Sequence, residues 1–97
     1  MKKEDVVKYL DQLVDGYISY TDGCNEMWNC CIFIHHNYSI HVDNHIQILA
    51  AAVGKELNHQ ERDSSHFKYA HSFEYKGVEL FQNDNNEKLP EVVWDEN

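Results

Sequence analysis

The hydrophobic pattern along the chain predicts two helices and two hairpins. Between Lys3 and Ile18, apolar residues recur at spacings of three and four, which is typical of one face of an amphipathic helix. These positions are Val6, Val7, Leu10, Leu13, Val14, Tyr17 and Ile18. The next stretch, SYTDGCNEMWN, has turn-forming residues centred on Asp22-Gly23, so we expect the helix to end there in a turn.

The segment between Glu26 and Asp43 contains no Asp, Glu, Lys or Arg. Its run Cys30 to Ile34 predicts a strand buried on both faces. A second short strand, Tyr38 to Val42, is expected to return from it through a turn at His36-Asn37. Together these two strands make the first predicted hairpin.

A second helix is predicted to start after Asp43 or Asn44. An Asx N-cap at Asn44 with Gln47 at the third helical position makes a capping box. The helix continues through HIQILAAAVGKEL, where Gly54 weakens the last turn. Its inward residues are expected to be Ile46, Leu49, Ala50, Val53 and Leu57. The polar stretch NHQERDSS is expected to be a connection.

The segment HFKYAHSFEYKGVELFQ predicts the second hairpin, because apolar and polar residues alternate along it. A two-residue turn at Lys76-Gly77 sets Tyr75 opposite Val78 and Phe73 opposite Leu80. Residues 83–97 form a loop and an acidic tail by composition, and the tail either docks as an edge strand or is mobile.

The order helix, hairpin, helix, hairpin predicts an α+β fold with two helices packed on one face of a small antiparallel sheet. A chain of 97 residues is expected to form a single domain with one modest core. The apolar runs are far too short to cross a bilayer, and the opening MKKEDVVKYL has no apolar core of a signal peptide. We therefore expect a cytoplasmic protein without a membrane partner.

The charge of the chain is strongly negative, with 17 acidic against 8 basic residues and a formal net charge of −9. This balance opposes direct binding to nucleic acid and favours a basic protein surface. The same acids need no partner if they serve only as a solvated surface. Candidate partner-binding residues are the acids outside the apolar faces: Asp11, Asp15, Glu56, Glu61, Asp63, Glu74, Glu79, Glu91, Asp95 and Glu96.

The stretch CNEMWNCCIFIHHNYSIHVDNH holds all three cysteines and four of the seven histidines. Zinc prefers four Cys and His ligands in a tetrahedron, and a small domain gains folding free energy from such a site. The predicted hairpin places Cys30 diagonal to His41, with His45 four residues further on, and a loop bearing Cys24 folding over the same spot. The candidate ligands of a structural zinc ion are thus Cys24, Cys30, His41 and His45. Asp43 is a candidate for orienting a ligand, and His35, His36 and His71 are alternative ligands.

Two other interpretations of the cysteines stay open. Free cysteine behaves as a small hydrophobic residue, so Cys30 and Cys31 fit the core of a strand equally well. A Cys30, His41 and Asp43 constellation is a candidate nucleophile, but the sequence indicates neither a lowered thiol pKa nor an oxyanion hole. We therefore expect no enzymatic activity.

Four features of the chain also occur together in a known group of proteins: the short domain, the excess of acidic residues, the hairpin FEYKGVELFQ and the absence of enzymatic motifs. In these features the chain resembles the small acidic anti-CRISPR proteins of phages and mobile elements that inhibit type II effectors. The resemblance implies a protein-binding inhibitor that occupies a basic surface of a Cas9-type effector in the bacterial host cytoplasm. Some members of that group contain a structural metal, so the resemblance is compatible with the zinc site described above. The alternative is a zinc-stabilised structural or regulatory module with an unrelated protein partner.

Overall fold

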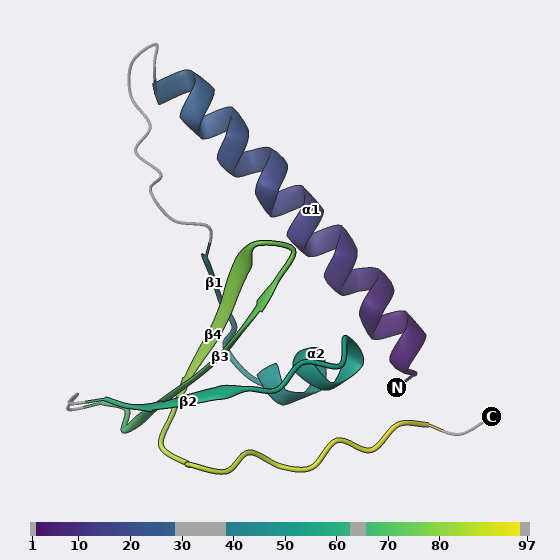
Figure 1. Cartoon of the computed structure of the whole chain (residues 1–97), viewed down its shortest axis with the longest axis vertical. Coiled ribbons are helices and arrows are strands. Elements are labelled where there is room, and N and C mark those ends of the chain that lie inside the picture. The colour runs from purple at the N-terminus through teal and green to yellow at the C-terminus, as the bar shows by residue number, and fades with distance from the viewer. Residues whose placement is uncertain (1, 29–38, 63–65, 96–97) are drawn as a thin grey trace.

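The structure, a computed structural model, describes residues 2–28, 39–62 and 66–95. This part of the chain contains two helices and four strands in an α+β arrangement, which confirms the predicted class (Figure 1). In chain order they are α1 (Lys3–Trp28), β1 (Ser39–His41), α2 (Ile46–Ala52), β2 (Asn58–Glu61), β3 (Tyr69–Tyr75) and β4 (Val78–Asp84).

The four strands form one mixed sheet in the order β1-β4-β3-β2. β2, β3 and β4 pair antiparallel, whereas β1 runs parallel to β4, so the expectation of a purely antiparallel sheet is wrong. A parallel pair needs a long crossover, and here the chain between β1 and β4 supplies it, including α2, β2 and β3. The strand predicted at Cys30 to Ile34 and its turn at His36-Asn37 lie outside the described residues.

Helix α1 begins as predicted but extends ten residues beyond Ile18, to Trp28. The turn predicted at Asp22-Gly23 is therefore wrong. Gly and Asp inside a helix cost only about 0.5–1 kcal/mol each relative to Ala. Extending an existing helix carries no nucleation cost, so a weak local signal for a turn does not end it.

Helix α2 starts without the predicted capping box. Its N-cap residue is His45, in a left-handed conformation with φ 67° and no side-chain cap, whereas Asn44 accepts a hydrogen bond from the His45 N–H at 2.9 Å. The first helical N–H, that of Ile46, instead donates to Oε1 of Gln82 in β4 at 2.9 Å. A distant side chain has thus replaced the local cap.

Helix α2 also ends earlier than predicted, at Ala52 rather than Leu57. Gly54 takes φ +69°, its N–H donates to the Ala51 carbonyl, and the Lys55 N–H donates to the Ala50 carbonyl at 2.9 Å. This pair of bonds is a Schellman motif, in which a left-handed glycine ends the helix. Further along the chain, Asn58–Glu61 form strand β2 where a polar connection was expected.

The β3–β4 hairpin confirms the prediction for this segment. Tyr75 pairs with Val78 and Phe73 pairs with Leu80. Lys76 and Gly77 both have positive φ, of 52° and 77°, which is the backbone of a type I′ turn. Strand β4 continues to Asp84, slightly further than the expected start of the loop at residue 83.

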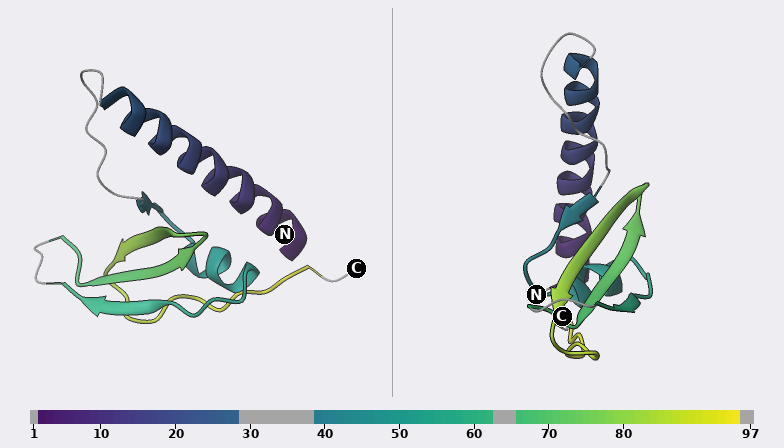
Figure 2. Two further views of the ribbon diagram at one scale, coloured as in Figure 1. Left: turned by 45° about the horizontal axis from the view of Figure 1, so that its top comes forward. Right: turned by 90° about the vertical axis from the view of Figure 1, so that its left-hand side faces the viewer.

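The hydrophobic core lies between the sheet and both helices. Leu10 and Val14 of α1 and Ile46 of α2 pack with Phe73 and Leu80, and all of these side chains are at most 2% exposed. The tail contributes Leu89, which is partly buried against this core, although no strand forms within the described residues 85–95. Both helices therefore cover the same face of the sheet. Figure 2 shows the helices and strands from two further sides.

Neither helix in the described part of the chain is long and apolar enough to cross a membrane.

Candidate functional site

The face of the sheet that points away from the helices is the candidate site. Strand alternation sends Phe73 and Leu80 to the core and the intervening side chains to the opposite side. We call this side the open face. Its residues are Ser39, His41, Asn58, Gln60, Ala70, Ser72, Glu74, Glu79, Phe81 and Asn83. All of them are exposed or half-buried, so the described helices leave this face to solvent.

Two glutamates face each other at the hairpin end of the open face. Glu74 of β3 and Glu79 of β4 are direct cross-strand partners and both are exposed. Like charges directly opposite each other on a sheet are destabilising. Within the part of the chain that the structure describes, neither carboxylate is paired with a cation. This pair therefore favours the approach of a positive group from outside.

A ring stack lies next to the two glutamates. His41 of β1 pairs with Phe81 of β4, and their rings are parallel, at an interplanar angle of 1° with centroids 4.8 Å apart. Beside Phe81, the small side chains of Ala70 and Ser72 leave a hollow of about 590 Å³ in the sheet surface. The walls of this hollow are formed by Gln60, Glu61, Arg62, Glu79 and Phe81.

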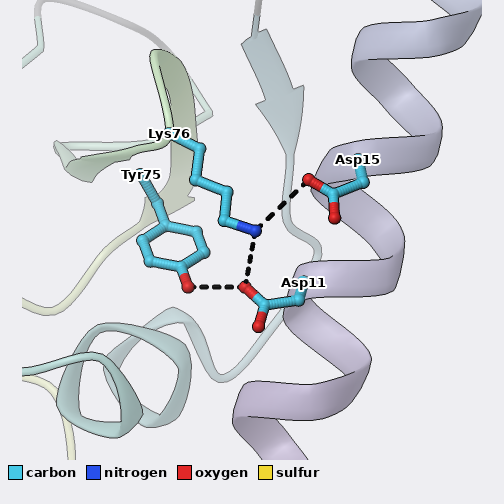
Figure 3. Close-up of polar contacts among 4 residues, drawn as sticks. All are labelled: Asp11, Asp15, Tyr75 and Lys76. Atoms are coloured by element: carbon cyan, nitrogen blue, oxygen red, sulfur yellow. Dashed lines mark hydrogen bonds and ion pairs between the residues drawn. The ribbon is translucent and has the colours of Figure 1, made fainter.

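Two of the predicted partner-binding acids, Asp11 and Asp15, hold α1 to the β3–β4 turn (Figure 3). The Tyr75 hydroxyl donates to Asp11 Oδ1 at 2.5 Å. Lys76 Nζ lies 3.1 Å from the same oxygen and 3.3 Å from Asp15 Oδ1. Both carboxylates thus bind side chains of the β3–β4 hairpin. We name Asp11, Asp15, Tyr75 and Lys76 the helix–hairpin clamp.

The hydrogen bonds of the clamp shift the pKa values of its members. The hydrogen bond from Tyr75, followed by that from Lys76, lowers the pKa of Asp11 below its ordinary value. The same bonds raise the pKa of Tyr75 and, through Asp11 and Asp15, that of Lys76. The Asp11 carboxylate and the Lys76 ammonium therefore stay charged together at neutral pH.

The other predicted partner-binding acids are distributed widely. Glu74 and Glu79 share the open face, and Glu61 borders its hollow. Glu56, Glu91 and Asp95 are exposed on loops elsewhere. Asp63 and Glu96 lie outside the described residues. The structure thus brings three of the ten predicted acids together around one surface.

The core side of the sheet carries a continuous polar network that begins at the start of α2. Gln82 is only 2% exposed, and besides accepting from Ile46 it donates through Nε2 to Asp84 Oδ2 at 3.1 Å. The Asn86 N–H donates to Asp84 Oδ1 at 2.8 Å. Burial alone would raise the pKa of Asp84, but the hydrogen bonds from Asn86, Gln82 and Asn85 outweigh it and hold the pKa below 3.8.

His71 continues this network to the surface. Its side chain is fully buried, and Nε2 lies 2.9 Å from the Asn86 carbonyl oxygen, which can only accept. In the neutral ring Nε2 therefore carries the proton, and Nδ1 accepts from Nδ1 of His59 at 2.5 Å. Both nitrogens of this alternative zinc ligand are consequently engaged within the protein.

The predicted zinc ligands are only partly covered by the structure. Cys24 falls within helix α1 rather than in the expected loop, and its side chain lies outside the described part, as do Cys30, Cys31, His35 and His36. His41 and His45 are exposed, as is Asp43. Among the described residues, no three His, Cys, Asp or Glu side chains form a group that could hold a metal ion. Since two of the four ligands are not described, the zinc site stays a prediction, and so does the alternative nucleophile at Cys30.

Comparison with protein-family models, with curated proteins and with solved structures finds no match in any of the three.

Sequence reasoning missed the hollow and the ring stack. The sequence assigns Phe81 to a hairpin strand, and it assigns His41 to the first hairpin, the zinc site or the nucleophile constellation. Their contact could not be predicted because it depends on the parallel pairing of β1 with β4. The alternation of β3 did place Ala70, Ser72 and Glu74 on one side, and the predicted register places Glu79 opposite Glu74. That part of the open face was therefore readable from the hairpin alone.

Proposed function

We propose that this chain is a protein-binding inhibitor without catalytic activity of its own, and that it binds a basic protein surface through the open face. The observation that carries the proposal is the Glu74–Glu79 pair, two exposed like charges placed directly opposite each other on a face that no described helix covers. A basic partner would relieve their repulsion, so the pair stabilises a complex more than it stabilises the free protein.

The partner that we propose is a Cas9-type effector. The overall charge of −9 supports a partner with an extended basic surface, and the resemblance to anti-CRISPR proteins supports this particular one. Such effectors hold a nucleic-acid heteroduplex in a positively charged channel. An acidic face that occupies part of this channel excludes the nucleic acid by competing for the same basic residues.

Binding and inhibition can be measured with purified protein and a purified Cas9-type effector. We expect a complex at low salt, inhibition of target-DNA cleavage, and weaker binding as salt shortens the Debye length from about 10 Å at 0.1 M to about 3 Å at 1 M. The double variant Glu74→Gln/Glu79→Gln should bind more weakly. The matched control Glu4→Gln/Asp5→Asn removes two exposed acids at the start of α1 and should bind nearly as the unmodified chain does.

Two results would count against the proposal. Cleavage that proceeds normally at a large excess of the protein would reject the effector as the target. Binding with the same affinity at low and high salt would reject the electrostatic mode of recognition.

A further inference from the structure

We infer that the open face is a docking site for an arginine side chain carried by an extended segment of the partner protein. The inference rests on the proposed function, because it assumes a basic protein partner, and it adds where that partner docks and which side chain it presents. The residues that carry it are Glu74, Glu79, Phe81 and the hollow beside them.

The hollow has the size and floor that a long side chain requires. Its volume of about 590 Å³ lies within the range of about 300–1,000 Å³ that is typical of binding cavities. Ala70 and Ser72 form the floor in the centre of the sheet, where larger side chains would fill the space. A side chain lying along the strands can therefore rest on β3 between the taller neighbours on β2 and β4.

Phe81 supplies an aromatic surface in the wall of this hollow. The His41 ring stacks on one face of Phe81, so it fixes the orientation of the ring and leaves the remainder of Phe81 to line the hollow. A planar guanidinium group stacks well on such a ring, and it is less strongly hydrated than an ammonium group. This feature favours arginine over lysine.

Glu79 places a carboxylate in the same wall, and Glu74 places a second one directly across the hairpin. A guanidinium group has five N–H donors in a rigid fork and can bind carboxylate oxygens in pairs. One arginine can thus stack on Phe81 while it donates to Glu79. Lysine carries a compact and more strongly hydrated charge, so it can neither stack as a plane on Phe81 nor bind a carboxylate through two parallel hydrogen bonds.

The opposite end of the hollow carries one cation beside one carboxylate, Arg62 beside Glu61, whereas two carboxylates lie together at the hairpin end. Arg62, the single arginine of the chain, lines this end and donates through Nη1 to Asn83 Oδ1. Its charge offsets the attraction that Glu61 exerts on a second cation there. The partner's arginine is therefore directed toward the hairpin end, where Glu74 and Glu79 lie.

The test is a titration of the isotope-labelled 97-residue chain followed by NMR. The probe is an extended 12-residue peptide with one central arginine, and the matched probes carry lysine or glutamine at that position. We expect the arginine peptide to shift the amide resonances of β3 and β4. We also expect it to bind about fivefold more tightly than the lysine peptide, with no binding of the glutamine peptide.

Variants assign the binding to this surface. Glu79→Gln should weaken binding of the arginine peptide at least fivefold, whereas Phe81→Leu should reduce the preference for arginine over lysine. Glu4→Gln/Asp5→Asn should change neither. If Phe81→Leu fails to fold, as its amide spectrum would reveal, Glu79→Gln and the comparison of peptides still decide.

The failures of the inference and of the proposed function are distinguishable. Equal affinity for arginine and lysine peptides, or loss of binding in the α1 variant but not in Glu79→Gln, would overturn the docking site while a basic partner could still bind elsewhere. Absence of any peptide binding at low salt would also overturn the docking site. The cleavage assay with the intact effector judges the proposed function separately.

Discussion

His71 shows how one buried polar side chain shapes this protein. Both ring nitrogens of His71 have hydrogen-bond partners, the Asn86 carbonyl and His59. Burial of an unpaired polar side chain would cost free energy, and these two bonds allow His71 to be buried. The bond to Asn86 also ties β3 to the beginning of the tail. The histidine pair therefore stabilises the start of the tail, together with the Asn86–Asp84 hydrogen bond and the packing of Leu89.

Replacing His59 with alanine should reveal the cost of an unsatisfied group. His59→Ala leaves Nδ1 of the fully buried His71 without its donor, which should lower the free energy of unfolding by about 1–3 kcal/mol. Urea unfolding at neutral pH measures this change. Gln60→Ala, at an exposed position on the same strand, is the control and should change the free energy by less than about 0.5 kcal/mol. A similar small change in the free energy of unfolding for both variants would show that the hydrogen bond from His59 to His71 does not stabilise the fold.

Asp84 makes the stability depend on acid. Because hydrogen bonds lower its pKa below 3.8 in the folded state, the folded protein favours the charged carboxylate more than the unfolded chain does. Its contribution is fully present above pH 3.8 and is lost as the pH falls through the lower, folded-state pKa.

The variant Asp84→Asn tests this linkage. It should be less stable at neutral pH, and its free energy of unfolding should fall less steeply below pH 3.8 than that of the unmodified chain. Asp11, whose pKa is also lowered, keeps part of the acid dependence in both proteins. Parallel curves for the two proteins down to pH 2 would contradict the role assigned to Asp84.

At the scale of elements, the two ends of α2 follow different physical rules. Its start depends on Gln82, a side chain 36 positions away, whereas its end depends on the local conformation of Gly54. The first of these cannot be read from nearby residues. The second has a familiar signal, because a glycine followed by polar residues commonly ends a helix.

Glycines in two different environments should respond in opposite directions to the same substitution. Gly54→Ala forces a side chain into a left-handed conformation and should destabilise the protein by about 1 kcal/mol. Gly16→Ala, inside α1 with open space around the added carbon, should stabilise it by up to about 1 kcal/mol. Thermal unfolding of the two variants measures both effects. Equal changes of the same sign would mean that Gly54 does not adopt the left-handed conformation that ends α2.

At the scale of the whole molecule, one side of the sheet is covered and the other is open. The helix–hairpin clamp fixes α1 over the core side through Asp11 and Lys76, while the open face keeps Glu74 and Glu79. The charged residues of this protein thus fall into two groups with different roles. Those in the clamp stabilise the arrangement of elements, and those on the open face are the ones that we propose for partner binding.

The predicted zinc site is also a question of the whole molecule, because its four ligands come from separate segments. If zinc binds Cys24, Cys30, His41 and His45, untagged protein should contain about one equivalent of metal per chain, and a chelator should lower the melting temperature. Cys30→Ser should lose the metal, and the neighbouring Cys31→Ala should keep it. Less than about a tenth of an equivalent of any transition metal would assign all three cysteines to packing instead.

Local patterns determined the parts of the fold that depend on neighbouring residues. The periodicity from Val6 to Ile18 predicted the side of α1 that packs on the core through Leu10 and Val14, although Leu13 of the same pattern is 49% exposed. Lys76-Gly77 predicted both the β3–β4 turn and its register. Each of these signals lies within a few residues, where helix and hairpin geometry act directly. The Glu74–Glu79 pair of the candidate site belongs to this group.

Tertiary structure alone decided the features that join distant segments. The parallel pairing of β1 with β4, the strand β2 in a polar stretch, and the cap that Gln82 provides for α2 all depend on contacts far apart in sequence. The ring stack of His41 on Phe81, and with it the hollow, follows from that pairing. The physical reason is the same in each case: a hydrogen bond or ring contact to a distant partner outweighs local preferences of only about 1 kcal/mol.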